Sequence, residues 1–303
     1  MANIFKLVAA VMPAATVAAA GAGPAFSHQP AVAADAVAIP FNPPLNQAVA
    51  YRYTRSDTRN GQPRETSIDL NVEFRGGAEG YLMTVRHVIP AAMERDPAAV
   101  LLTRPLVLRV DQEGAILGLE DEAGYWRDVE TLLSETARGS ADPVGAARVM
   151  ESMLTRMRGL PDIERLALLT RNVSPILEFA GRLLPKGGIR ESNQRESVLG
   201  SLTQTLDVTW TRDDAEYLRI LVVATIPPDQ LTRGIGGFVQ DLVPHRAGEV
   251  GRVTNFEERT DYRVSMMTGL TEEWTTQRTL VSDSEDGSET IRSGQSLTRI
   301  IVR

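Results

Sequence analysis

The chain of 303 residues contains no cysteine. Because a disulfide framework and a lipoprotein anchor both need a cysteine thiol, the sequence excludes both. Histidine is also scarce, and the two histidines beyond the N-terminal segment, His87 and His245, are not spaced as metal ligands. We therefore expect no metal and no cofactor, and a fold stabilised by its core alone.

Aromatic residues make up 5% of the chain, which is too little for the aromatic girdles of an outer-membrane barrel. After residue 22 no run approaches the roughly 18 apolar residues that a membrane span requires. The net charge of −7 disfavours a nucleic-acid partner, since phosphate binding needs a positive field. Lysine is nearly absent and arginine is spread along the whole chain, which we interpret as compositional bias rather than a basic patch.

The first 33 residues have the pattern of a signal peptide. Lys6 supplies a positive start, residues 7–22 are rich in Ala and Val, and candidate cleavage sites follow Ala22, Ser27 and Ala33. An uncleaved anchor is the alternative, but a core dominated by alanine is weakly hydrophobic for a span. We expect export to a Gram-negative periplasm as a soluble protein, with a Pro-rich disordered linker over residues 34–46 and one domain over residues 47–303.

Period-two alternation begins near residue 48 and predicts antiparallel strands. The clearest run alternates Ile68, Leu70, Val72 and Phe74 with polar residues. A further strand over residues 81–89 places Met83 and His87 on one face, and a hairpin follows at residues 106–119. These runs predict an antiparallel meander.

Helical spacing replaces this alternation over residues 124–185. Asp142 and Pro143 form an N-cap and first helical position, and the helix that they open carries an apolar stripe that includes Met150, Met153, Leu154 and Met157. Pro and Gly at residues 185–188 end this helical block.

Strand patterns return over residues 201–225 and 251–302, separated by residues 231–242. That intervening segment has apolar residues at helical spacing, including Phe238, but its three glycines indicate a weak helix or a mobile flap. Helices inserted between two groups of strands predict an α+β domain. We expect a large curved antiparallel sheet, an open half-barrel, covered on one face by the helical block.

This order of elements resembles the periplasmic lipoprotein carriers of the LolA/LolB type. The resemblance includes two phrases of turn and strand, residues 108–114 and residues 268–271, and extends from Ala48 to the C-terminus. It implies an incompletely closed barrel, lidded by helices, that holds acyl chains between its two layers.

A cluster of methionines and neighbouring apolar residues is the candidate ligand site, because flexible thioether side chains adapt to varied apolar ligands. The candidates are Met83, Met150, Met153, Leu154, Met157, Phe238, Met266 and Met267. The alternative is that these residues are ordinary core. We expect a non-catalytic protein that binds or carries an apolar small molecule or acyl chain, or else an envelope interaction protein with a packed interior.

A hydrolase of envelope substrates is the remaining alternative. Paired acids suit general acid and base catalysis, and they occur at residues 120–122, 213–214 and 272–273. Because they fall mostly at expected turns and strand ends, and no nucleophile or nucleotide-binding motif accompanies them, we assign no catalytic residue. The sequence leaves the oligomeric state open.

Overall fold

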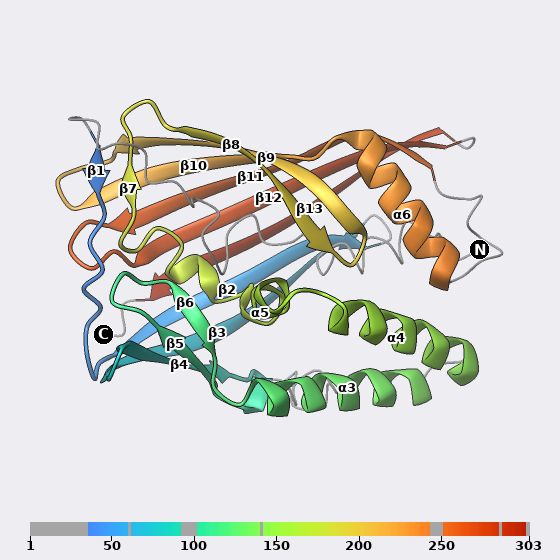
Figure 1. The fold of residues 1–303 in the computed structure, drawn as a ribbon, viewed down its shortest axis with the longest axis horizontal. Helices are drawn as coiled ribbons and strands as arrows, with labels where there is room; N and C mark the ends of the chain where they lie inside the picture. The colour runs from blue at the N-terminus through green and yellow to red at the C-terminus, as the bar shows by residue number, and fades with distance from the viewer. Residues whose placement is uncertain are drawn as a thin grey trace.

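The computed structural model describes residues 36–59, 62–91, 102–139, 142–242, 251–284 and 287–300. The predicted signal peptide with its three cleavage sites, and also His245, lie outside these ranges. Within them the protein is an α+β domain built on a large antiparallel sheet that does not close on itself (Figure 1). No helix in the described ranges is long and apolar enough to cross a membrane.

Eleven strands of the described chain form the large sheet. They are β2 (Ala48–Arg59), β3 (Gln62–Gly77), β4 (Gly80–Val88), β5 (Leu106–Val110), β6 (Ile116–Leu119), β8 (Ile189–Ser197), β9 (Gly200–Arg212), β10 (Tyr217–Thr225), β11 (Arg252–Ser265), β12 (Thr271–Ser284) and β13 (Gly287–Ile300). A second small sheet pairs β1 (Val37–Ala38) with β7 (Leu183–Leu184).

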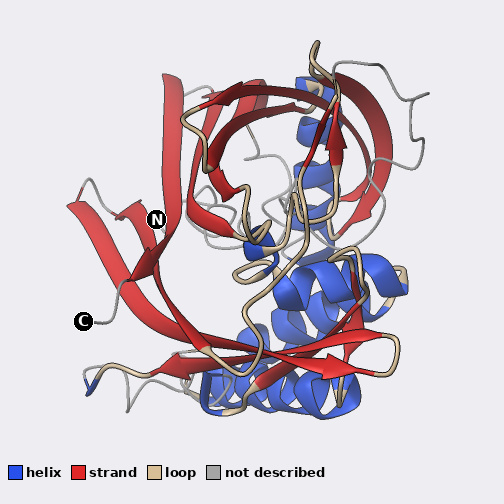
Figure 2. Cartoon of the chain, turned by 90° about the vertical axis from the view of Figure 1, so that its left-hand side faces the viewer, coloured by secondary structure: helices blue, strands red, loops and turns tan. Residues whose placement is uncertain are grey.

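The large sheet is a meander in which the first and the last long strands of the chain pair with each other at its centre. Its order is β6-β5-β4-β3-β2-β13-β12-β11-β10-β9-β8, so the last strand, β13, pairs with the first long strand, β2. The outer strands are therefore β6 and β8. Figure 2 shows the strands curving through a broad arc, with the helices toward the right and the bottom of the view.

The helices form where the sequence predicts a helical block, with different ends. They are α3 (Glu122–Arg138), α4 (Pro143–Arg158), α5 (Asp162–Thr170), the short 3₁₀ helix η2 (Ser174–Ile176) and the separate α6 (Pro228–Leu242). The Asp142 side chain accepts a hydrogen bond from the Gly145 N–H at 3.0 Å, so the predicted cap of α4 is confirmed. Residues 177–182, expected to be helical, are turns that end at Gly181 with a φ of 68°.

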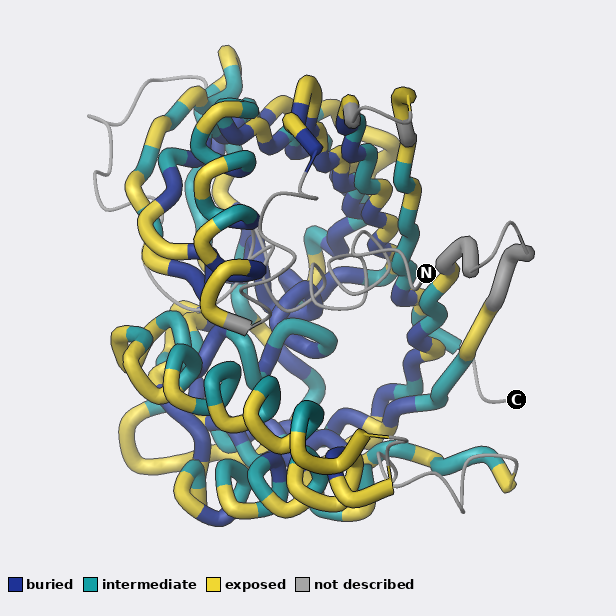
Figure 3. Tube along the Cα trace, turned by 90° about the vertical axis from the view of Figure 1, so that its right-hand side faces the viewer, coloured by how far each residue is buried: buried dark blue, intermediate teal, exposed yellow. Residues whose placement is uncertain are grey.

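A single helical cover over one face of the sheet is not confirmed. The helices α3 and α4 pack on each other, and α4 has no fully buried side chain. Figure 3 shows this pair mostly in the colours of exposed and intermediate residues. The most extensive contacts with the sheet come instead from α6, which packs on β9 and β11, and from η2, which packs on β12, while Leu166 of α5 joins the core.

Residues 36–46 are not a disordered linker where the structure describes them, and this prediction is wrong. The Ile39 N–H donates a hydrogen bond of 2.8 Å to the Arg182 carbonyl, and Ile39 is buried. The Phe41 ring meets Tyr81 edge to face at 5.1 Å between centroids. The prediction of disorder rested on the proline content of this segment. The segment is ordered because apolar residues between the prolines, such as Ile39, bury their side chains against the rest of the protein.

The core divides into two clusters. The larger cluster joins strands β2–β5 and β9–β12 to residues 173–184, and it includes Phe179 and Tyr262. The smaller cluster lies under α6, where Leu231, Ile235 and Phe238 are buried. The segment predicted as a weak helix or flap is therefore a packed helix, because its apolar stripe outweighs the helix-propensity cost of its glycines.

Candidate functional site

A cavity of about 1130 Å³ lies between the two outer strands of the sheet. Its wall is formed by the β5–β6 hairpin, α5, residues 174–185 and the beginning of β8. We call it the edge cavity. Its larger apolar lining side chains include Ile116, Leu117, Ile163, Leu166, Leu177 and Leu184. Such a lining is typical of small-molecule sites, which usually enclose about 300–1,000 Å³.

The apolar lining extends from the interior to the surface. Leu166, Leu177 and Leu184 are buried, whereas Leu117 is 53% exposed and Ile163 is 43% exposed. These last two residues belong to the few large apolar side chains that the described surface exposes. Exposed apolar residues that are scattered singly over a surface are ordinary. Leu117 and Ile163 instead line the same cavity, which is typical of a binding site.

Residues 174–182 form the inner wall because they are anchored to the sheet. The Thr271 hydroxyl donates a buried hydrogen bond of 2.7 Å to the Pro175 carbonyl. The Phe179 ring, 1% exposed, meets the Tyr262 ring edge to face at 5.0 Å between centroids. Gly181 completes the wall, because a Cβ there would lie 1.9 Å from the Glu113 carbonyl oxygen and only glycine permits this approach.

Helix α5 spans the gap between the outer strands. Arg195 of β8 makes an ion pair of 3.2 Å with Glu164 of α5, and both side chains are largely buried. On the other side, the Arg165 guanidinium lies 3.7 Å from the Glu122 carboxylate at the start of α3. Ion pairs of α5 thus connect β8 to the start of α3, which follows β6 in the chain, and α5 lines the edge cavity beside them.

The edge cavity contains one strongly perturbed titratable group among the described residues. Glu178 is 7% exposed, and burial raises the pKa of its carboxyl to about 7, against an opposing effect of Arg182 and Arg195. The Arg182 Nη2 donates a hydrogen bond of 3.3 Å to Glu178 Oε1. Burial therefore moves the titration of this carboxyl toward neutral pH.

The predicted ligand residues are not gathered at this cavity. Met83 is fully buried in the larger cluster, and Met266 packs against the same cluster. Met153, Met157 and Phe238 belong to the smaller cluster under α6. Met150 and Leu154 are half-buried on α4, and Met267 is 71% exposed. None of these eight residues lines the edge cavity, and the structure places them in different surroundings. A ligand-binding role for them stays a prediction.

Sequence reasoning missed the residues that do line the cavity. The strand β8 has the sequence IRESNQRES, which carries almost no apolar period, and its beginning forms part of the wall. Residues 177–184 have apolar residues at helical spacing, but their place depends on contacts with Tyr262 and Thr271 far along the chain. The glycines at 181 and 188, which precede and follow β7 with positive φ, were the available indication of a shaped loop.

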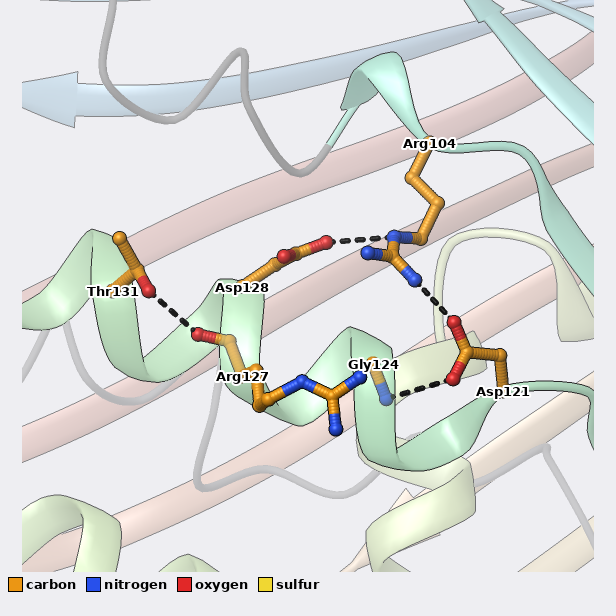
Figure 4. Close-up of polar contacts among 6 residues, drawn as sticks. All are labelled: Arg104, Asp121, Gly124, Arg127, Asp128 and Thr131. Atoms are coloured by element: carbon orange, nitrogen blue, oxygen red, sulfur yellow. Dashed lines mark hydrogen bonds and ion pairs between the residues drawn. The ribbon is translucent and has the colours of Figure 1, made fainter.

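Asp121, one of the three acids at residues 120–122, has a structural role. Its Oδ1 accepts a hydrogen bond of 3.1 Å from the Gly124 N–H, which caps α3, and its Oδ2 pairs with Arg104 (Figure 4). The same arginine contacts Asp128, two turns later, at 2.7 Å. Arg104 therefore ties the first turns of α3 to the chain that enters β5.

Replacing Asp121 with alanine is expected to lower the free energy of unfolding by about 2 kcal/mol, from the lost cap and from a φ of 53° that alanine tolerates poorly. Asparagine at this position keeps the capping oxygen and the left-handed backbone, so it should cost clearly less. Urea unfolding of the two variants measures the difference. Equal losses for alanine and asparagine would show that the ion pair, and not the cap, holds this end of the helix.

The other acid pairs lie apart from one another and from His87. Asp213 pairs with Arg263 at 3.3 Å, and Glu272 pairs with Arg299 across β12 and β13. His87 lies on β4, and burial lowers its pKa. Within the described ranges no group of three or more acids, histidines or cysteines is arranged to hold a metal ion.

Comparison with known proteins finds similarity to solved structures alone. No protein-family model and no curated protein matches the chain. A solved structure described as lipid-protein interactions in lipovitellin is similar over 84% of this chain, with a TM-score of 0.43 and 10% identity. The chain spans 25% of that lipovitellin chain. A likeness at this TM-score assigns neither a shared fold nor an activity, so the function has to be argued from the cavity.

Proposed function

We propose that this chain is a non-catalytic exported protein that binds an apolar ligand, such as an acyl chain, in the edge cavity. The observation that carries the proposal is the aliphatic lining of the cavity, which continues from buried Leu177 to exposed Leu117 and Ile163. An extended apolar ligand that enters past these two side chains would cover them and remove its own surface from water.

The energetics favour a chain-like ligand. Each methylene group that leaves water contributes about 0.8 kcal/mol. A chain of several methylenes therefore gains enough to offset the cost of its own ordering and of association. The proposal includes an open, half-barrel form of the sheet. It also includes a carrier role like that of the LolA/LolB-type proteins, whose order of elements this chain resembles. The apolar sequence of residues 7–22 supports export to the periplasm.

The test is binding of N-phenyl-1-naphthylamine, an uncharged apolar fluorophore, to the mature protein. Exchanging Leu117 or Ile163 for glutamate puts a charge at the cavity opening, and we expect each exchange to weaken binding at least about tenfold, since a charge that loses water without a partner is costly. Fluorescence titration measures the dissociation constants.

The matched controls are Val88→Glu and Val144→Glu, at exposed apolar positions outside the lining. They make the same chemical change and should leave the dissociation constant as it is. If they weaken binding as much as the cavity variants, or if the fluorophore does not bind, the proposal fails. A packed envelope interaction protein would then explain the fold better. Native mass spectrometry of protein purified from the periplasm would add the identity of a retained ligand.

A further inference from the structure

The wall of the edge cavity carries a buried carboxyl group whose second oxygen has no partner in the described structure. Arg182 donates to Oε1 of Glu178, and no described residue donates to Oε2. Glu178 lines the edge cavity and is 7% exposed, so a ligand in the cavity can reach its carboxyl group.

Acidic residues outnumber basic ones in the wall of this cavity. The acids are Asp111, Glu113, Glu122, Asp162, Glu178 and Glu191, and the arginines are Arg109, Arg182 and Arg190. Outside the lining, Asp207 pairs with Arg190 at 3.5 Å, and Arg165 pairs with Asp162 at 2.8 Å and lies 3.7 Å from Glu122. With these partners included the acids still outnumber the arginines, so the field at the opening disfavours an anionic ligand relative to a cationic one.

We infer that the ligand of the edge cavity is an amphiphile with a protonated amine head group, which donates a hydrogen bond to Glu178 Oε2 while its alkyl chain lies along the aliphatic lining. This inference rests on the proposed function, since it adds a head group to the chain that the cavity holds.

An ammonium group fits Glu178 better than other head groups do. A carboxylate with a pKa raised by burial is poorly solvated, and a cationic donor both satisfies its free oxygen and offsets that cost. A hydroxyl group supplies the hydrogen bond without the charge, so it binds more weakly. A carboxylate or phosphate head group meets repulsion from Glu178 and from the acids of the wall.

The experiment compares decylamine, decanol and decanoate by isothermal titration calorimetry, at pH 8 and below the concentrations at which micelles form. An alkylamine is protonated at this pH, as the lysine side chain is. We expect decylamine to bind about tenfold more tightly than decanol, because a hydrogen bond between charged groups is stronger than one from a neutral hydroxyl group. Decanoate should bind least tightly of the three. In Glu178→Gln the ratio of the decanol to the decylamine dissociation constant should fall by about tenfold.

Glu258→Gln is the matched control, because Glu258 is also a buried acid paired with an arginine, Arg278, but does not line the cavity. Its ratio should equal that of the unmodified protein. Equal affinities for decylamine and decanol, or an unchanged ratio in Glu178→Gln, would overturn the head-group inference and leave the proposed function in place. If none of the three compounds binds, both are rejected.

Discussion

Replacing Phe179 with alanine is expected to lower the free energy of unfolding by about 3–5 kcal/mol, the range for a large aromatic residue removed from a packed core. The ring is 1% exposed and packs edge to face on Tyr262 of β11. Its removal leaves a cavity between the sheet and the segment that forms the inner wall of the edge cavity. Urea unfolding followed by circular dichroism measures the loss through the midpoint at constant m-value.

Leucine at position 179 is the graded control for this prediction. It keeps much of the apolar volume and loses only part of the contact with Tyr262, so it should cost clearly less than alanine. The alanine variant should also bind the apolar fluorophore more weakly, since the wall that contains Leu177 and Glu178 loses its anchor. A loss of stability below about 1 kcal/mol would mean that Phe179 does not hold residues 174–182 to the sheet.

Exchanging Glu178 for glutamine is expected to remove a pH dependence of stability worth about 3 kcal/mol, which corresponds to the rise of its pKa from 4.5 to about 7. Below about pH 4.5 the side chain is protonated in both states, so its stabilising effect is complete. As the pH rises toward 7 the unfolded chain releases the proton that the folded protein retains. The free energy of unfolding therefore falls, and the contribution is lost above pH 7.

The measurement is the difference between the unfolding free energies of Glu178→Gln and the unmodified protein from pH 4 to pH 8. The difference should rise in favour of the variant and level off above pH 7. Arg182 and Arg195 act on this carboxyl electrostatically. Because both arginines and the other titratable groups are present in both proteins, their own effects on stability largely cancel in the difference. A flat difference would show that Glu178 is solvated and not buried.

Asp69→Asn provides a control of opposite sign. The Arg52 guanidinium holds the pKa of Asp69 below its ordinary value, with the two groups 2.8 Å apart. Its stabilising effect is present above the unfolded pKa and is lost as the pH falls through the lower folded pKa. The loss in Asp69→Asn should therefore shrink at acid pH, whereas Glu178→Gln gains its advantage toward neutral pH.

The strands with one buried face were predictable, because burial of one face leaves a period of two in the sequence. Leu70, Val72 and Phe74 are buried on β3 as their alternation predicts. The Asp142 cap was also predictable, because a helix cap depends on residues that are close together in the sequence. The polar edge strand β8 was not, since its pairing with β9 depends on backbone hydrogen bonds that any side chain permits.

The candidate site was not predictable from helical spacing. A methionine stripe such as Met150, Met153 and Met157 indicates a face that meets something apolar, but the spacing alone does not tell a core from a cavity. In the structure Met153 and Met157 pack against the cluster under α6. The edge cavity instead combines residues 109–118 with residues 162–191, which come together only when the sheet curves.

The sequence by itself determined the class of this protein: an acidic α+β domain without cysteine, in which two groups of antiparallel strands enclose a helical segment. Those features follow from local periodicity and composition. Only the tertiary structure decided that β13 pairs with β2, that β6 and β8 become facing edges, and that Glu178 lies buried between them. The physical reason is that a gap between edges, and the pKa of a group inside it, are set by contacts between segments far apart in the chain.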